Sequence, residues 1–267
     1  MNRTTPIVLN LLIINVLLFA ATYFTGRILT EHLALYYPAS PYFRPYQLIT
    51  HIFMHGGITH IFFNMYALWM FGTPIETAWG GKRFLFYYFF TGLGAAALHL
   101  FVNYLVFSGI QADIVAFSNT PSPELFRQFI DAHTDGFNEN FISACYSLYS
   151  EWFDVPDKQA YADTALEIMR NISGELMNVP TVGASGAVFG LLLAFGMMYP
   201  NVQLMLIIPP IPIKAKWFVL GYGAIELVLG FSQPGSNIAH FAHIGGMLFG
   251  YLLIRFWISR ARRNPNQ

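Results

Sequence analysis

The sequence predicts an all-α polytopic membrane protein, with six transmembrane helices and an extramembrane helical insert between the third and the fourth. Of the 267 residues, 55% are hydrophobic and only 10% are charged, and the mean hydropathy is +0.47. These values lie outside the range of ordinary soluble domains. The chain also contains repeated apolar stretches, several of them close to the roughly 20 residues that a helix needs to cross a bilayer.

Six apolar stretches follow one another along the chain. They cover residues 7–25, 57–73, 84–107, 183–200, 217–232 and 238–258. Two of the shorter stretches carry unusual polar residues, and a helix that starts inside a protein-lined cavity would be short for that reason. The first stretch is interpreted as an uncleaved anchor, because its apolar core is long and no clear A-x-A cleavage site follows it.

Basic residues between the stretches set the orientation. They are Arg3, Lys82, Arg83, Lys214, Lys216, Arg260, Arg262 and Arg263. By the positive-inside rule all of them are cytoplasmic, which is consistent only with an even number of spans and with both termini inside. We therefore expect a multi-pass integral membrane protein with both termini cytoplasmic. A bacterial inner membrane is the expected location.

The region between the third and fourth stretches differs from the rest in charge. Residues 108–182 contain eleven Asp or Glu against three Lys or Arg, a net charge of about −8. The expected organisation is 1–107 for the first three membrane helices, 108–182 for an acidic insert, and 183–267 for the last three helices and a basic tail. The insert is either a solvated segment with no binding role or an element that docks substrates or partners.

Cys145 is the single cysteine of the chain, so no intrachain disulfide can form. It is expected to be a small buried hydrophobic residue of the insert.

Polar residues inside the predicted spans reach a common depth. Ser185 lies just inside the outer end of the fourth span, and His243 lies about five residues into the sixth. His60 and Asn64 lie early in the second span, which also enters from outside. At about 1.5 Å per residue, these four groups lie within roughly 10 Å of the outer surface, where water can reach a shallow cavity.

Local spacing adds geometry to this layer. His60 and Asn64 are four residues apart and share a helix face, so both can donate hydrogen bonds to one oxygen. Spans four and six run in the same direction and each carries a GxxxG ridge that permits close helix packing. The ridges are formed by Gly186 with Gly190 and by Gly246 with Gly250. Their contact would bring Ser185 toward His243, as a serine nucleophile requires.

Other polar residues offer two alternative kinds of site. Paired histidines at His51 and His55, or at His240 and His243, have workable spacing for a metal ion. No cysteine joins them, and the only acid well inside a span, Glu226, is expected to lie deeper than the histidine layer. We therefore expect no metal and no cofactor. Glu226 leaves open a polytopic transporter, although the spans otherwise lack Lys and Asp for a proton relay.

Three segments together resemble a known family. HGGITHIFFN in span two, GASGAVFG in span four and AHFAHIGGMLFG in span six are similar to the signature segments of the rhomboid intramembrane serine proteases. The resemblance covers about 190 of the 267 residues and leaves the acidic insert outside. It implies that Ser185 is the nucleophile and His243 the general base, in a dyad without a carboxylate. It also implies an oxyanion hole made by His60, Asn64 and the backbone N–H of Ser185.

The resemblance extends to supporting residues and has departures. It implies that Phe189 packs on the catalytic imidazole and that Glu76 is structural. The Trp-Arg pair of the first outer loop is replaced by Tyr46-Gln47, so a typical loop-anchoring contact is expected to be missing. His240 is a rival base, expected at the water interface, and His243 is preferred because Gly245 and Gly246 follow it as in the family.

The function expected from these residues is an intramembrane serine endopeptidase that cleaves transmembrane segments near the outer surface. Its partners would be transmembrane protein substrates and the lipid bilayer, with no nucleic acid. The sequence leaves the oligomeric state open. The alternatives are a catalytically silent rhomboid-like binder of transmembrane clients and a transporter that uses Glu226.

Overall fold

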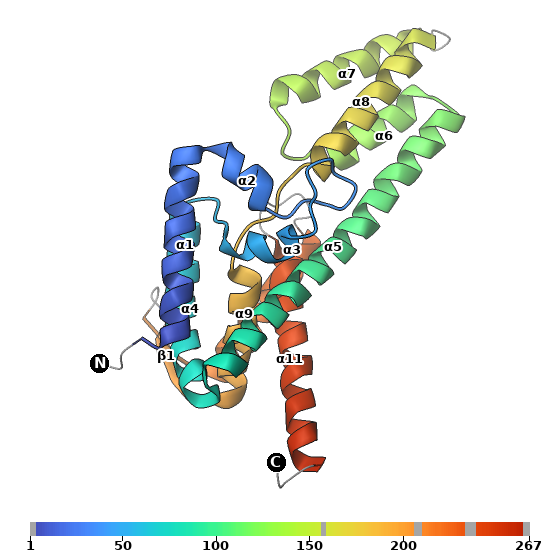
Figure 1. The fold of residues 1–267 in the computed structure, drawn as a ribbon. Helices are drawn as coiled ribbons and strands as arrows, with labels where there is room; N and C mark the ends of the chain where they lie inside the picture. The colour runs from blue at the N-terminus through green and yellow to red at the C-terminus, as the bar shows by residue number, and fades with distance from the viewer. Residues whose placement is uncertain (1–3, 156–158, 206–209, 233–238, 264–267) are drawn as a thin grey trace. The chain divides into compact units, whose positions relative to one another are not determined.

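The computed structural model describes residues 4–155, 159–205, 210–232 and 239–263; Arg3 and residue 238 of the predicted sixth span lie outside them. Almost all regular structure in these ranges is helical (Figure 1), with one short antiparallel hairpin that pairs Gln203 with Lys214. The elements are α1 (Pro6–Thr25), α2 (Arg27–Leu33), α3 (Gln47–Thr50), the 3₁₀ helix η1 (His51–Phe53), α4 (Ile58–Trp79), α5 (Gly81–Asn119), α6 (Pro123–His133), α7 (Glu139–Asp154), α8 (Gln159–Met177), α9 (Ser185–Met198), β1 (Gln203–Met205), β2 (Pro212–Lys214), α10 (Ala215–Ser232) and α11 (His240–Arg263).

The chain divides into two compact units. The core unit consists of Met1–Leu35, Tyr42–Leu100 and Pro180–Gln267, and the insert unit consists of Tyr36–Pro41 and Phe101–Val179. The insert unit therefore begins before residue 108 and includes a short segment from much earlier in the chain.

Helices of the core unit occupy all six predicted spans, which confirms an all-α polytopic membrane fold. Four of them, α1, α5, α10 and α11, are long and apolar enough to cross a membrane. Helix α9 is apolar but has only 14 residues. At 1.5 Å per residue it is about 21 Å long, short of the roughly 30 Å of a bilayer core.

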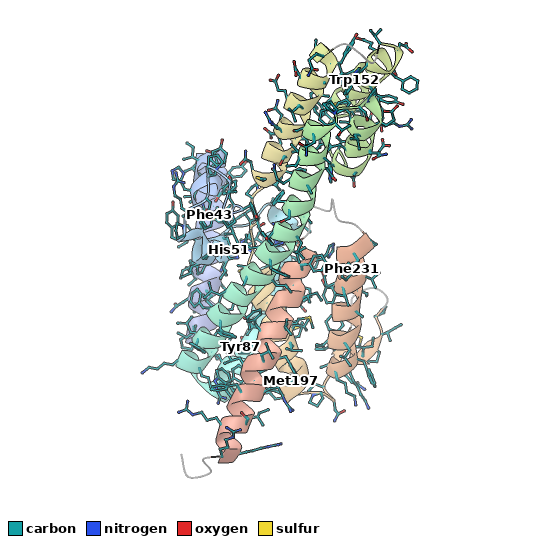
Figure 2. The ribbon with its side chains drawn as sticks, turned by 90° about the vertical axis from the view of Figure 1, so that its right-hand side faces the viewer. Phe43, His51, Tyr87, Trp152, Met197 and Phe231 are labelled. Carbon is teal, nitrogen blue, oxygen red and sulfur yellow. The ribbon has the colours of Figure 1, made fainter. Side chains whose placement is uncertain are left out.

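Protein surrounds this short helix on most sides. It packs against α11 most extensively, and also against α4 and α10. Ten of its 14 residues are buried, and the hydroxyl of Tyr87, labelled in Figure 2, donates to the carbonyl of Gly190 at 2.8 Å. Because neighbouring helices cover α9, it can begin and end at membrane depth without exposing backbone groups to lipid.

Helix α5 differs from its predicted span. The predicted span ends at residue 107, where the predicted insert begins. In the structure the helix continues into the insert without a break as far as Asn119. Polar residues after 107 mark a change of environment but include no proline before Pro121 and Pro123, and the single Gly109 does not end the helix. With 39 residues, α5 is about 58 Å long, and its far end belongs to the insert unit.

Glu76 anchors the start of α1. Its buried carboxylate accepts hydrogen bonds from the Thr5 hydroxyl and from the backbone N–H groups of Ile7 and Val8, at 3.0 and 2.8 Å for the two N–H groups. These N–H groups belong to the first helical turn, which lacks intrahelical partners and carries the positive end of the helix dipole. Glu76 is therefore structural, as the resemblance implied, and it joins α4 to α1.

The first outer loop is anchored by Gln47, contrary to the expectation that an anchor was missing. The Gln47 side chain is fully buried. Its amide nitrogen donates to the carbonyls of His32 and Tyr42 at 3.2 and 2.9 Å, and its oxygen accepts from the N–H of Arg44 at 3.0 Å. One planar amide thus joins the end of α2 to the loop around Tyr42 and Arg44, which the sequence comparison with a Trp-Arg pair did not reveal.

The insert unit has its own apolar core, built from the end of α5 and from α6, α7 and α8. Phe117 from α5 meets Trp152 from α7 edge to face, with ring centroids 5.9 Å apart. Helix α6 begins at Pro123, directly after Ser122, whose hydroxyl accepts from the N–H of Leu125 at 3.2 Å. A proline at the first position after a serine cap is a strong helix start. Cys145 is a free cysteine buried in this core.

Candidate active site

Ser185 is the first residue of α9, directly after a tight backbone turn. Gly183 has φ +127°, a conformation that favours glycine, and a Cβ there would lie 2.8 Å from Nε2 of His60. The first intrahelical bond runs from the N–H of Val188 to the carbonyl of Ala184. The earlier N–H groups of α9 form the positive end of the helix, which favours negative charge beside Ser185.

His243 lies beside this serine. Its Nε2 is 2.8 Å from Oγ of Ser185, although the two residues are 58 positions apart. The close approach of α9 and α11 makes this possible, because a Cβ on Gly246 would overlap the carbonyl oxygen of Gly186. Backbone therefore touches backbone at the crossing, as glycine ridges permit.

The ring of Phe189 stacks on one face of the His243 ring. The two rings are stacked with centroids 4.1 Å apart and an interplanar angle of 4°. Phe189 is four residues after Ser185, so both side chains leave the same face of α9. Tyr222 from α10 packs on Phe189 at 4.9 Å. Apolar contacts thus restrict rotation of the imidazole.

His60 and Asn64 occupy one face of α4 near the Ser185 turn. Asn64 is buried, and its amide donates to the backbone carbonyl of His60 at 2.9 Å. Nδ1 of His60 accepts from the N–H of Gly56 at 3.3 Å, which leaves Nε2 toward Gly183. His55 lies edge-on to His60, with centroids 5.1 Å apart. Burial, followed by the nearby His60, lowers the pKa of His55 to about 4, so His55 is neutral at neutral pH.

Glu226 corrects the sequence interpretation. It was expected below the histidine layer, with His243 free of any carboxylate. Instead its Oε2 is 2.8 Å from Nδ1 of His243 and 2.7 Å from Nδ1 of His240. Glu226 lies six residues before the end of α10, and His243 lies three residues after the start of α11. The backbone of Glu226 is therefore deeper than that of His243, and the length of the glutamate side chain bridges the difference. Counting residues from the membrane surface gives the depth of the backbone and takes no account of side-chain length.

His240 is also placed differently from the expectation. It was predicted at the water interface, but it is only 4% exposed. Within the part of the chain that the structure describes, Glu226, His240 and His243 form one group whose candidate metal-binding atoms lie within 4.8 Å of one another. Both Nδ1 atoms contact the same carboxylate oxygen at hydrogen-bond distance.

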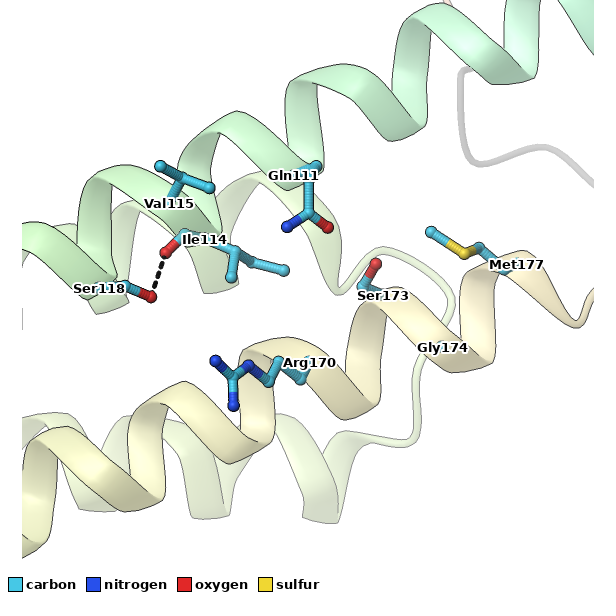
Figure 3. A pocket seen from close by; sticks show the side chains of 8 residues that line it. All are labelled: Gln111, Ile114, Val115, Ser118, Arg170, Ser173, Gly174 and Met177. Atoms are coloured by element: carbon cyan, nitrogen blue, oxygen red, sulfur yellow. Dashed lines mark hydrogen bonds between the residues drawn. The ribbon is translucent and has the colours of Figure 1, made fainter. Parts of the chain in front are cut away.

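A separate hollow lies in the insert unit, between α5 and α8 (Figure 3). Its lining includes Gln111, Ser118, Arg170 and Ser173. The Ser118 hydroxyl is occupied by the carbonyl of Ile114 at 2.8 Å. This hollow contains none of the site residues that the sequence predicts.

Comparisons with known proteins agree on one family. The family model described as "Rhomboid domain" matches residues 42–120 and 159–260. The segment between the two matched ranges, 121–158, is shorter than the predicted insert 108–182. The chain is 23% identical over 220 residues to Rhomboid protein 1, mitochondrial, of Saccharomyces cerevisiae, covering 82% of this chain and 44% of that protein. It is 42% identical over 60 residues to Rhomboid protease GluP of Bacillus subtilis, covering 22% of this chain and 12% of that protein.

The chain thus spans less than half the length of either curated relative. The family match itself covers well over half of the chain and includes α4, α9, α10 and nearly all of α11. It agrees with the all-α membrane fold of the core unit. The chain is therefore a multi-pass membrane protein of the rhomboid family, whose members are in general intramembrane proteases that act on transmembrane substrates.

Proposed function

We propose that this protein is an intramembrane serine endopeptidase that cleaves transmembrane segments of other proteins near the outer membrane surface. The observation that carries the proposal is the 2.8 Å contact between Oγ of Ser185 and Nε2 of His243. A hydroxyl and an imidazole at this distance form the nucleophile and base that acyl transfer needs. The stacked Phe189 ring supports a fixed orientation of that base.

In the proposed reaction, Nε2 of His243 takes the Ser185 hydroxyl proton as Oγ attacks the scissile carbonyl carbon. The negative charge that develops on the carbonyl oxygen is stabilised by the N–H of Ser185 at the start of α9 and by donors from His60 and Asn64. His243 then gives its proton to the leaving amine. Water hydrolyses the acyl-enzyme by the same steps in reverse order.

The substrate must present an accessible carbonyl, and a transmembrane helix does not. Its carbonyls are occupied by intrahelical hydrogen bonds, so segments with helix-breaking residues near the outer surface are the expected substrates. No cofactor or metal takes part in this scheme.

The test is covalent labelling of the purified full chain. A fluorophosphonate reacts with activated serines and ignores ordinary helix hydroxyls, so mass spectrometry should find the adduct on Ser185. The same preparation should cut a transmembrane model substrate within its membrane segment, as sequencing of the products would show. Intact substrate together with an unlabelled Ser185 in folded protein would support the silent binder instead.

We further propose that both termini are cytoplasmic, following the distribution of Lys and Arg, and that the membrane is a bacterial inner membrane. Cysteines at Lys82 and Lys214 should then resist a membrane-impermeant thiol reagent in intact cells, whereas a cysteine at the exposed Asp163 should react. The native Cys145 gives little background because burial raises the pKa of its thiol. Reaction at Lys214 with protection at Asp163 would invert the topology.

A further inference from the structure

The proposed reaction above does not use the carboxylate of Glu226. It comes from α10, whereas the two histidines that it contacts come from α11. His240 and His243 are three residues apart and therefore share a face of α11. The Glu226 and His243 side chains are 6% and 10% exposed, so water does not replace these contacts.

These contacts determine where the protons lie. An ionised carboxylate only accepts hydrogen bonds, so Nδ1 of His243, at 2.8 Å from Oε2 of Glu226, carries the hydrogen. In the neutral ring the other nitrogen, Nε2, then holds the free lone pair. That nitrogen is 2.8 Å from the Ser185 hydroxyl, which is the atom whose proton must be removed. The carboxylate thus selects the tautomer that can act as a base.

His240 holds the carboxylate in place. Its Nδ1 is 2.7 Å from the same Oε2 atom, so the oxygen accepts two N–H groups from one helix face. A carboxylate fixed by a second donor cannot rotate away from His243. Stacking on Phe189 sets the plane of the imidazole ring, but stacking cannot distinguish its two tautomers.

We propose that Glu226 is a positioning residue that keeps His243 protonated on Nδ1 and stabilises the imidazolium formed during catalysis, with His240 holding the carboxylate. The inference rests on the proposed protease function and extends it from a dyad to a Ser185–His243–Glu226 triad. Glu226 would orient the histidine and stabilise its imidazolium, as a buried aspartate does in soluble serine proteases.

The test is Glu226→Gln in the full chain, purified in detergent. The amide has similar volume but no negative charge, so Nδ1 of His243 loses its charged acceptor and the imidazolium is stabilised less. The rate of fluorophosphonate labelling at Ser185 and kcat for a transmembrane substrate should each fall by about 10²-fold, with KM unchanged. NMR of ¹⁵N-histidine-labelled protein should show the His243 hydrogen on Nδ1 in the wild type.

Glu76→Gln is the matched control, because Glu76 is also a buried glutamate but serves the start of α1. It should lower Tm and leave the labelling rate unchanged below Tm. His240→Asn should lower the labelling rate by less than Glu226→Gln does, because the bond to His243 remains.

Three results would overturn the inference. One is a wild-type labelling rate in Glu226→Gln, and another is a His243 hydrogen on Nε2 in the wild-type NMR spectrum. The third is loss of wild-type activity in EDTA with recovery in Zn²⁺, which would assign the group to a metal. If Glu226→Gln does not fold, the wild-type NMR spectrum decides, since hydrogen on Nε2 excludes the role. Absence of any label on wild-type Ser185 would instead refute the protease proposal itself.

Discussion

Ser185→Ala and His243→Ala are each expected to lower cleavage of a transmembrane substrate by at least about 10³-fold, because they remove the nucleophile and its base. Fluorophosphonate labelling at residue 185 should be lost in the first variant and reduced to background in the second. Because the two groups act as one unit, the double variant should be no slower than either single variant. Product formation measured by mass spectrometry over long incubations provides the necessary range.

Asn64→Ala is the graded comparison. Removing one oxyanion donor costs about 10²–10³ in rate, and the backbone N–H of Ser185 and the His60 ring remain. Cleavage of the substrate by Asn64→Ala should therefore remain measurable, whereas cleavage by Ser185→Ala should not exceed background. Cleavage by Ser185→Ala at the wild-type site would refute the serine mechanism, and inhibition of the wild type by EDTA would favour a histidine-bound metal.

Gly246→Ala is expected to disrupt the site without touching any reacting group. A Cβ at this position would overlap the carbonyl oxygen of Gly186, which is backbone and cannot move independently of α9. The helices must separate, and a displacement of about 1 Å between reacting groups costs on the order of 10²-fold in rate. Overpacking adds about 1–3 kcal/mol of destabilisation. Labelling rate and Tm should therefore both fall, and Gly246→Val should be more severe.

Gly221→Ala provides the control for this prediction. The change is chemically the same and also lies in a membrane helix of the core unit, but nothing lies within 4 Å of a Cβ built there. Its labelling rate and Tm should match those of the wild type. Wild-type behaviour of Gly246→Ala would show that the crossing of α9 and α11 tolerates separation.

The bilayer explains why much of this fold was predictable from the sequence. Each span must be apolar over a fixed length, so a polar Ser185 or His243 stands out, and its depth follows from counting residues. The glycine ridges then pointed to the contact between α9 and α11, which the structure contains.

Tertiary contacts decided the features that the sequence interpretation missed. Counting residues placed Glu226 too deep because it ignored the reach of a glutamate side chain. The replacement of Trp-Arg by Tyr46-Gln47 was interpreted as a lost anchor, yet Gln47 bonds to its own loop at Tyr42 and Arg44 and also to His32, 15 residues away. The end of α5 was placed at the change in polarity, but a helix ends where its backbone geometry is interrupted.

The crossing of α9 and α11 also orders events during synthesis. Ser185 precedes His243 by 58 residues, and Glu226 lies between them on α10. A nascent chain whose α9 has entered the membrane therefore holds a serine without its base, however well its earlier helices have packed. Only insertion of α11 against the glycine contact supplies the imidazole. The proposed hydrolytic site thus arises in one late step, and partly translated chains cannot cut the membrane proteins beside them.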